Sequence, residues 1–157
     1  MIHLHIESRY RALKLGAAVR KAALAALAQQ NSQAAELSVA LTGNVQVRRL
    51  NQQFRGVDAA TDVLSFGAEQ APAGAGDTYL GDIVISVPRA RAQARAAGHS
   101  LAAEVQLLTV HGVLHLLGYD HASAAQRRRM WAAQDAILAA LRLPMRSAEM
   151  ETRPEAK

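Results

Sequence analysis

The sequence of 157 residues contains no cysteine. This absence excludes disulfide bonds, thiolate nucleophiles and every zinc site that is built on cysteine ligands. It also agrees with a cytoplasmic protein, because disulfides belong mainly to oxidising compartments outside the cytosol. Aromatic residues make up only 4% of the chain, so we expect a core built mainly from aliphatic side chains and alanine.

Long apolar runs are also absent. No segment approaches the ~20 apolar residues that a membrane-spanning helix requires. The first residues lack the basic start and the apolar stretch of a secretory signal peptide. We therefore expect a cytoplasmic protein with no membrane partner. Half of the residues are apolar, which at this length suits one domain that buries a core without covalent staples.

The charge is unbalanced towards the positive side. The formal net charge is +5 and the sequence pI is about 10.2. Fifteen arginines stand against three lysines, and the planar guanidinium group suits phosphate. This balance favours a polyanionic partner, but a GC-rich genome would produce the same arginine bias. The run Arg127, Arg128 and Arg129 is a candidate RNA contact, although such runs are usually solvated surface.

The apolar pattern predicts four strands and about five helices. Alternation predicts strands at residues 2–6 and 36–42. A short apolar segment after a polar loop predicts a third strand at 63–66, and a run of β-branched residues predicts a fourth at 80–87. Helical periodicity predicts helices over residues 11–29, 45–54, 88–98, 101–117 and 124–143.

The helix over residues 101–117 is apolar on almost every side, so we expect it to be the buried central helix. His3 and His5 fall on the polar side of the first strand and are ordinary surface residues in this interpretation. We expect a single domain over residues 1–143, followed by a polar, disordered tail over residues 144–157.

Half of the six histidines lie within residues 111–121. His111 and His115 are four residues apart, so on a helix their imidazoles share one face, as one metal ion requires. His121 would lie on nearly the opposite side if the helix continued. Gly118 can adopt the left-handed conformation that ends a helix, and the chain can then bring His121 back over the first two. The pattern predicts a three-histidine metal site with an open coordination position.

Such a site leaves a divalent ion its full charge and room for water, whose pKa it can lower to about 7. Imidazole ligands suit zinc, although nickel, cobalt or copper would also accept them. In His-Glu-x-x-His metallopeptidases a glutamate general base follows the first histidine. Gly112 occupies that position here and argues against a peptidase.

Two acidic residues near the histidines have open roles. Asp120 can hydrogen-bond a histidine or simply belong to the turn after Tyr119. Glu104 lies about two turns before His111, too far for direct ligation in a straight helix. It either supports a ligand from behind or is merely polar.

The string at residues 111–121 resembles the signature of the YbeY family, the metal-dependent endoribonucleases of bacterial ribosomal RNA maturation. The likeness extends over nearly the whole chain, to about residue 142. Its other matching segments are Leu50-Asn51 through Arg55, Asp58, Thr61-Asp62-Val63-Leu64-Ser65-Phe66, residues 81–86 and residues 98–100. Ala60 and Gly67 stand where the family often has proline, and Arg95 where it often has an acid. These departures concern loop geometry and partner surfaces.

The resemblance implies an α+β fold around a mixed four-stranded sheet. It implies His111, His115 and His121 as ligands of one zinc ion per chain, and Arg55 as a functional arginine near the metal in a cleft. The implied activity is single-strand-specific endoribonuclease action in 16S ribosomal RNA 3′-end maturation and ribosome quality control. Single-stranded RNA, the small ribosomal subunit and ribosomal proteins are the implied partners.

Two other hypotheses stay open. The first is a ribosome-associated RNA-binding assembly factor with a structural metal and no turnover, because Gly112 leaves the site without an obvious protein base. The second is a hydrolase of a peptide or a small ester, which rests only on the helix that carries two histidines.

Overall fold

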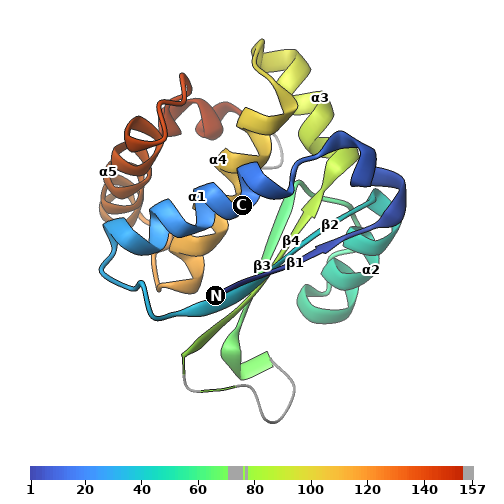
Figure 1. Cartoon of the computed structure of the whole chain (residues 1–157), viewed down its shortest axis with the longest axis horizontal. Coiled ribbons are helices and arrows are strands. Elements are labelled where there is room, and N and C mark those ends of the chain that lie inside the picture. The colour runs from blue at the N-terminus through green and yellow to red at the C-terminus, as the bar shows by residue number, and fades with distance from the viewer. Residues whose placement is uncertain (71–75, 77, 154–157) are drawn as a thin grey trace.

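Four strands form one mixed sheet in the order β1-β2-β4-β3 (Figure 1). The computed structural model describes residues 1–70, 76 and 78–153. The strands β1 and β2 are parallel to each other and to β4, whereas the edge strand β3 runs antiparallel to β4. Their bounds are Ile2–Ile6, Glu36–Thr42, Val63–Gly67 and Tyr79–Ser86 in chain order. The expected α+β class, the four strands and the mixed sheet are confirmed.

Five α-helices surround this sheet, as expected. They are α1 Gly16–Gln29, α2 Asn44–Arg55, α3 Val87–Ala97, α4 Leu101–Leu116 and α5 Ala124–Ala140. Figure 1 shows α1, α4 and α5 on one side of the strands and α2 on the other. The described residues also form three short 3₁₀ helices, at Ser8–Leu13, Ala68–Gln70 and Ser147–Thr152.

The main core lies between the sheet and helices α1, α4 and α5. Leu37, Val39 and Leu41 of β2 point into it, as the alternating pattern predicts. On the opposite face, Val84 of β4 belongs to a smaller cluster with Val47 of α2. Both faces of the central strand β4 are therefore covered, which explains its run of β-branched residues.

Helix α4 is the predicted buried central helix. Its residues from Ala103 to Leu114 are buried without a break. Ser100 caps the helix start, where its side chain accepts a hydrogen bond of 3.0 Å from the Ala103 N–H. None of the described helices is long and apolar enough to cross a membrane.

The prediction of one helix over residues 11–29 is wrong at its start. A 3₁₀ helix ends at Leu13, Lys14 turns to a φ of 53°, and α1 begins only at Gly16. Leu24 is 49% exposed, so it does not belong to the buried stripe. That stripe consists of Val19, Ala22, Ala23, Ala26 and Leu27. Its small side chains allow α1 to lie close to its neighbours.

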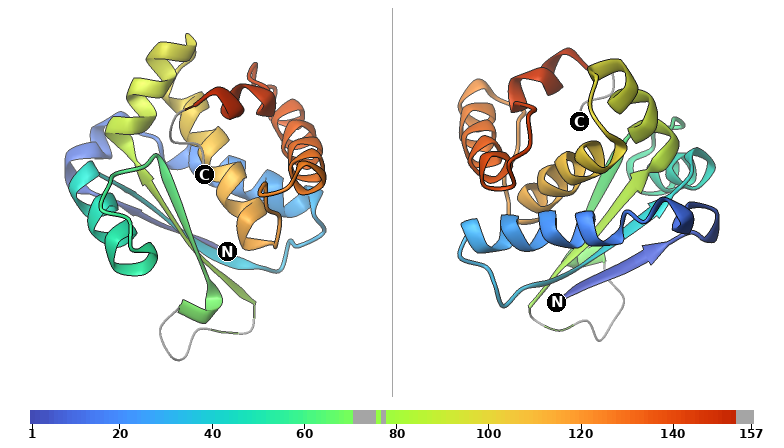
Figure 2. Two further views of the ribbon diagram at one scale, coloured as in Figure 1. Left: turned by 180° about the vertical axis from the view of Figure 1, so that it is seen from behind. Right: turned by 45° about the horizontal axis from the view of Figure 1, so that its top comes forward.

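The prediction of a disordered tail is wrong over residues 144–153. Met145 and Met150 are buried in a cluster with Leu138 of α5 and Leu107 of α4. In Figure 2 this segment, in dark red, runs beside α5 towards α3 and α4. Two methionines separated by mainly polar residues carry no helical or strand period, so this packing could not be predicted from the pattern. Residues 154–157 lie outside the described residues.

Candidate metal centre

The three histidines of the predicted site meet at the carboxyl end of α4. One ligand nitrogen from each of His111, His115 and His121 lies within 4.8 Å of the other two. The Nε2 atoms of His111 and His115 are 3.1 Å apart. The His121 ring lies 5.4 Å from that of His111 and 5.1 Å from that of His115, centre to centre. The fold therefore brings together the residues that the spacing selects.

The return of His121 depends on the turn after α4. Gly118 has a φ of 101°, in the left-handed region, and its N–H donates to the His115 carbonyl at 3.0 Å. The Tyr119 hydroxyl donates to Gln30 Oε1 at 2.9 Å, which ties the turn to the end of α1. Asp120 Oδ1 accepts the backbone N–H of His121 at 2.7 Å. Of its two open roles, Asp120 therefore shows that of a turn residue.

The donor set fits a divalent cation. The His121 Nε2 atom is buried, and no described residue forms a hydrogen bond with it. A buried nitrogen without a partner is unfavourable, and a metal ion shared with two further imidazoles would satisfy it. His111 is 1% exposed, and Trp131 stacks on the His121 ring at 5.6 Å between centres. The cluster is thus closed by protein on one side.

On its open side the cluster borders a cleft of about 470 Å³. Arg55, the last residue of α2, lines the same cleft. Its Nη2 donates to the Ser65 carbonyl at 2.7 Å, and its guanidinium lies 5.7 Å from the centre of the Phe66 ring. The hydrogen bond uses one of five N–H groups, so Arg55 is held in place with donors to spare.

The outer edge of β3 forms part of the cleft wall. The Ser86 N–H donates to the Asp62 carbonyl at 2.9 Å. In an antiparallel pair every second residue bonds to the partner strand, so this bond and the register show which residues of β3 bond to β4. The backbone groups of Ser65 and Gly67 therefore point away from β4, at the sheet edge. Both residues line the cleft together with Arg55.

Glu69 also lines the cleft, and sequence reasoning missed it. A Cβ atom on Gly67 would stand within 3.0 Å of the Glu69 carboxylate, so the glycine gives this side chain room to fold over the end of β3. Glu69 has no hydrogen bond or ion pair with another described residue. A single acid after the third strand is too weak a signal to find it from the sequence.

Gly112 and Glu104 have structural explanations. A Cβ atom on Gly112 would lie 2.9 Å from Ile83 Cγ2, because α4 packs against β4 at this point. Position 112 therefore faces the sheet, and no general base fits there. Glu104 is fully buried and lies 2.6 Å from both His99 Nε2 and Arg153 Nη1. Its partners are thus not the three clustered histidines.

Asp62 is a second buried carboxyl, at the start of β3. Burial raises its pKa to about 6, and the nearby charge of Glu104 adds to the rise. The Val63 N–H donates to its Oδ1 at 2.7 Å.

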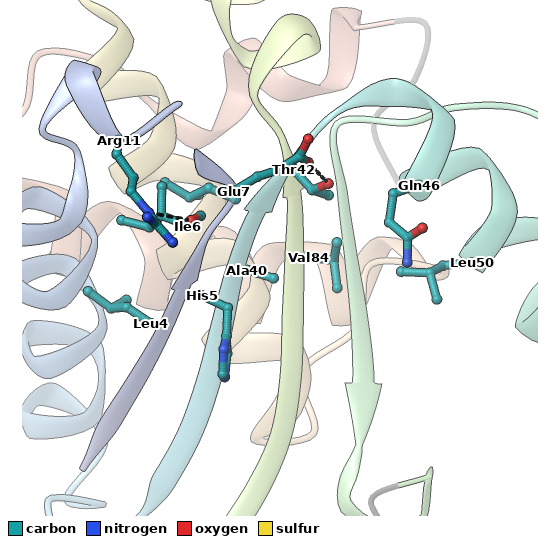
Figure 3. Close-up of a pocket in the computed structure, with 11 residues that line it drawn as sticks. Leu4, His5, Ile6, Glu7, Arg11, Ala40, Thr42, Gln46, Leu50 and Val84 are labelled. Atoms are coloured by element: carbon teal, nitrogen blue, oxygen red, sulfur yellow. Dashed lines mark hydrogen bonds between the residues drawn. The ribbon is translucent and has the colours of Figure 1, made fainter. Parts of the chain in front are cut away.

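A second cavity, of about 670 Å³, lies on the opposite face of the sheet (Figure 3). Its single histidine, His5, is exposed, as the sequence predicts. Thr42 Oγ1 donates to Glu7 Oε2 at 2.6 Å, so the carboxylate in this cavity is already engaged. This cavity lacks the grouped ligands that the cleft has.

Two residues of the arginine run lie near the histidine cluster: Arg127 lines a pocket with His111 and His121, and Arg129 lines another with the turn after α4. Arg127 pairs with Glu151 at 3.1 Å, and Arg129 lies near Tyr119 and Asp120 of the turn. Contact of this run with RNA stays a prediction.

The chain also matches known proteins. The family model described as Endoribonuclease YbeY matches residues 5–142. A relative named Endoribonuclease YbeY from Moorella thermoacetica is 52% identical over 126 residues, covering 76% of this chain and 81% of its own. Another of that name, from Chloroflexus aurantiacus, is 48% identical over 133 residues, covering 80% of this chain and 86% of its own.

A solution structure of a Thermotoga maritima protein matches with a TM-score of 0.58 and 24% identity, over 100% of this chain and 99% of that one. This match supports the fold alone. The family model and the close relatives together show that this chain belongs to the endoribonuclease YbeY family.

Proposed function

We propose that this protein is a metal-dependent endoribonuclease in which His111, His115 and His121 bind one divalent ion and Arg55 contacts the scissile phosphate. One observation carries the proposal. Three imidazoles with ligand nitrogens within 4.8 Å share a cleft with an anchored arginine, in a chain of an endoribonuclease family.

The donor set supports zinc as the metal. Three neutral imidazoles favour zinc among the abundant divalent ions, and we propose one zinc ion per chain. When bound, such an ion supplies positive charge opposite the phosphate and lowers the pKa of its water to about 7.

The protein groups around the cleft complete the chemistry. The guanidinium of Arg55 and the edge N–H groups of Ser65 and Gly67 can donate to the non-bridging phosphate oxygens, where charge grows in the transition state. Because the Ser65 carbonyl and the Phe66 ring hold Arg55, little freedom is lost when RNA binds.

Glu69 is the proton acceptor that the sequence did not reveal. As water attacks phosphorus, one of its protons passes to the Glu69 carboxylate and a new P–O bond forms. The bond from phosphorus to the ribose oxygen breaks, and that oxygen takes a proton from solvent. This role rests on the position of Glu69 in the cleft that the three histidines also line.

The substrate proposal follows from the cleft and the family. The ligands lie between the edge of β3 and the turn after α4, where one extended RNA strand can reach them. We propose single-stranded RNA as the substrate, with 16S ribosomal RNA 3′-end processing and ribosome quality control as the roles, in the cytoplasm with the small ribosomal subunit as partner. Membership of the family and the net charge of +5 support this assignment.

The test combines elemental analysis with cleavage of a single-stranded RNA. Wild type and Arg55→Ala should carry about one metal per chain, and His115→Ala should lose it. Cleavage should fall about a hundredfold or more in both variants. Arg49→Ala is the control, since Arg49 is an exposed arginine of the same helix outside the cleft, and it should cleave like wild type.

Full cleavage by metal-free His115→Ala would refute the proposal. If wild type carries the metal but does not cleave, the hypothesis of a binding factor with a structural metal takes its place.

A further inference from the structure

The second ring nitrogen of His111 is held by a buried glutamine. His111 Nδ1 and Gln134 Oε1 are 3.0 Å apart, and Gln134, on α5, is fully buried. An amide oxygen can only accept, so Nδ1 carries the proton and Nε2 keeps its lone pair. That lone pair lies on the side of His115 Nε2, 3.1 Å away. Gln134 therefore presents His111 to the ion in the ligating tautomer.

The C-terminal segment, residues 145–153, fixes the orientation of Gln134. Gln134 Nε2 donates to Ser147 Oγ at 2.9 Å and contacts Met150 Sδ at 3.2 Å. With its amide nitrogen engaged there, the amide oxygen must face His111. Ser147 is itself held, since its N–H donates to Asp135 Oδ1 at 2.7 Å.

The end of this segment is anchored in the core. Arg153 donates to both carboxylate oxygens of Glu104, at 2.6 and 3.0 Å, and to Gln93 Oε1 at 3.1 Å. Glu104 is fully buried, so this bidentate ion pair is shielded from water. Met145 and Met150 are buried beside it. Apolar packing and the buried ion pair thus hold the segment that supports Gln134 in place.

We infer that residues 145–153 are part of the metal centre: they position Gln134, which in turn orients His111. This inference rests on the proposed three-histidine metal site. An outer partner of a ligating histidine typically changes metal affinity by 10- to 100-fold. Glutamine is suited to the position because it accepts from His111 and donates to Ser147 at once, whereas a glutamate could only accept.

The experiment measures zinc affinity of the full-length protein by titration against a competing chelator. Fluorescence of Trp131 reports binding, because it is the only tryptophan and stacks on His121. Gln134→Leu should weaken zinc binding about 10- to 100-fold. Ser147→Ala should weaken it in the same direction by less. Gln52→Leu is the matched control at an exposed glutamine of α2 and should bind zinc like wild type.

A comparison of two substitutions separates positioning from packing. Gln134→Glu restores an acceptor for His111 and should bind zinc more tightly than Gln134→Leu. Without metal, the order of thermal stability should be reversed, because leucine buries no charge. If zinc affinity instead follows apoprotein stability, or if Gln134→Leu binds zinc like wild type, the inference is overturned. Failure of wild type itself to bind zinc would instead overturn the three-histidine site.

Discussion

Replacement of Gly112 by alanine tests how closely α4 packs against the sheet beneath the histidines. An alanine Cβ would stand 2.9 to 3.0 Å from three side-chain carbons of Ile83. Ile83 is fully buried, so it cannot move aside without disturbing its neighbours. Gly16→Ala is the matched control, because a Cβ there would meet Leu4 and Ile6 at an ordinary 3.5 Å.

Of the two variants, Gly112→Ala should be the less stable. Alanine gains about 1 kcal/mol over glycine inside a helix, whereas overpacking a tight core costs about 1–3 kcal/mol. Gly112→Ala should therefore range from neutral to about 2 kcal/mol less stable. Gly16→Ala, at the first turn of α1, should be neutral or up to about 1 kcal/mol more stable.

Urea unfolding of the metal-free proteins measures this difference in the free energy of unfolding. It is calculated from the midpoint urea concentrations, with one dependence on urea concentration (m-value) used for both variants. Zinc affinity of the same samples shows whether the strain at Gly112 reaches the adjacent His111. If Gly112→Ala is as stable as Gly16→Ala or more so, Ile83 yields without cost and the packing argument fails.

Three further predictions concern charge, chemistry and metal. Since burial raises the pKa of Asp62 to about 6, the folded chain keeps a proton that the unfolded chain releases near its usual value of 3.8. The free energy of unfolding of wild type should therefore fall between about pH 4 and pH 6, by up to about 3 kcal/mol relative to Asp62→Asn. If urea unfolding gives the two proteins the same pH dependence, the prediction is wrong. Glu69→Gln should keep metal and RNA binding but lower kcat about 10²- to 10⁴-fold, and an unchanged kcat would remove Glu69 from the chemistry. Excess zinc at about 100 times its Kd should stabilise wild type by about 3 kcal/mol. His121→Ala should show no such gain in calorimetry, and a full gain would exclude His121 as a ligand.

The sequence determined the local features of this protein. Alternation of apolar and polar side chains located β1 and β2. Apolar residues on almost every side of α4 identified it as the central helix. The spacing of His111 and His115 with a stop at Gly118 predicted the histidine cluster, because helix geometry and a left-handed glycine act within a few residues. Resemblance to a family added Arg55, which no local pattern distinguishes from the other arginines.

Only the tertiary structure decided which distant residues serve that cluster. Glu69 reaches the cleft because β3 is an edge strand that ends at Gly67, and Gln134 reaches His111 because α5 packs beside α4. The order of the tail likewise depends on a partner far away in the chain, since Arg153 is held by Glu104. Periodicity reports the environment of one element, whereas these contacts join elements through a shared core, and only packing fixes their geometry.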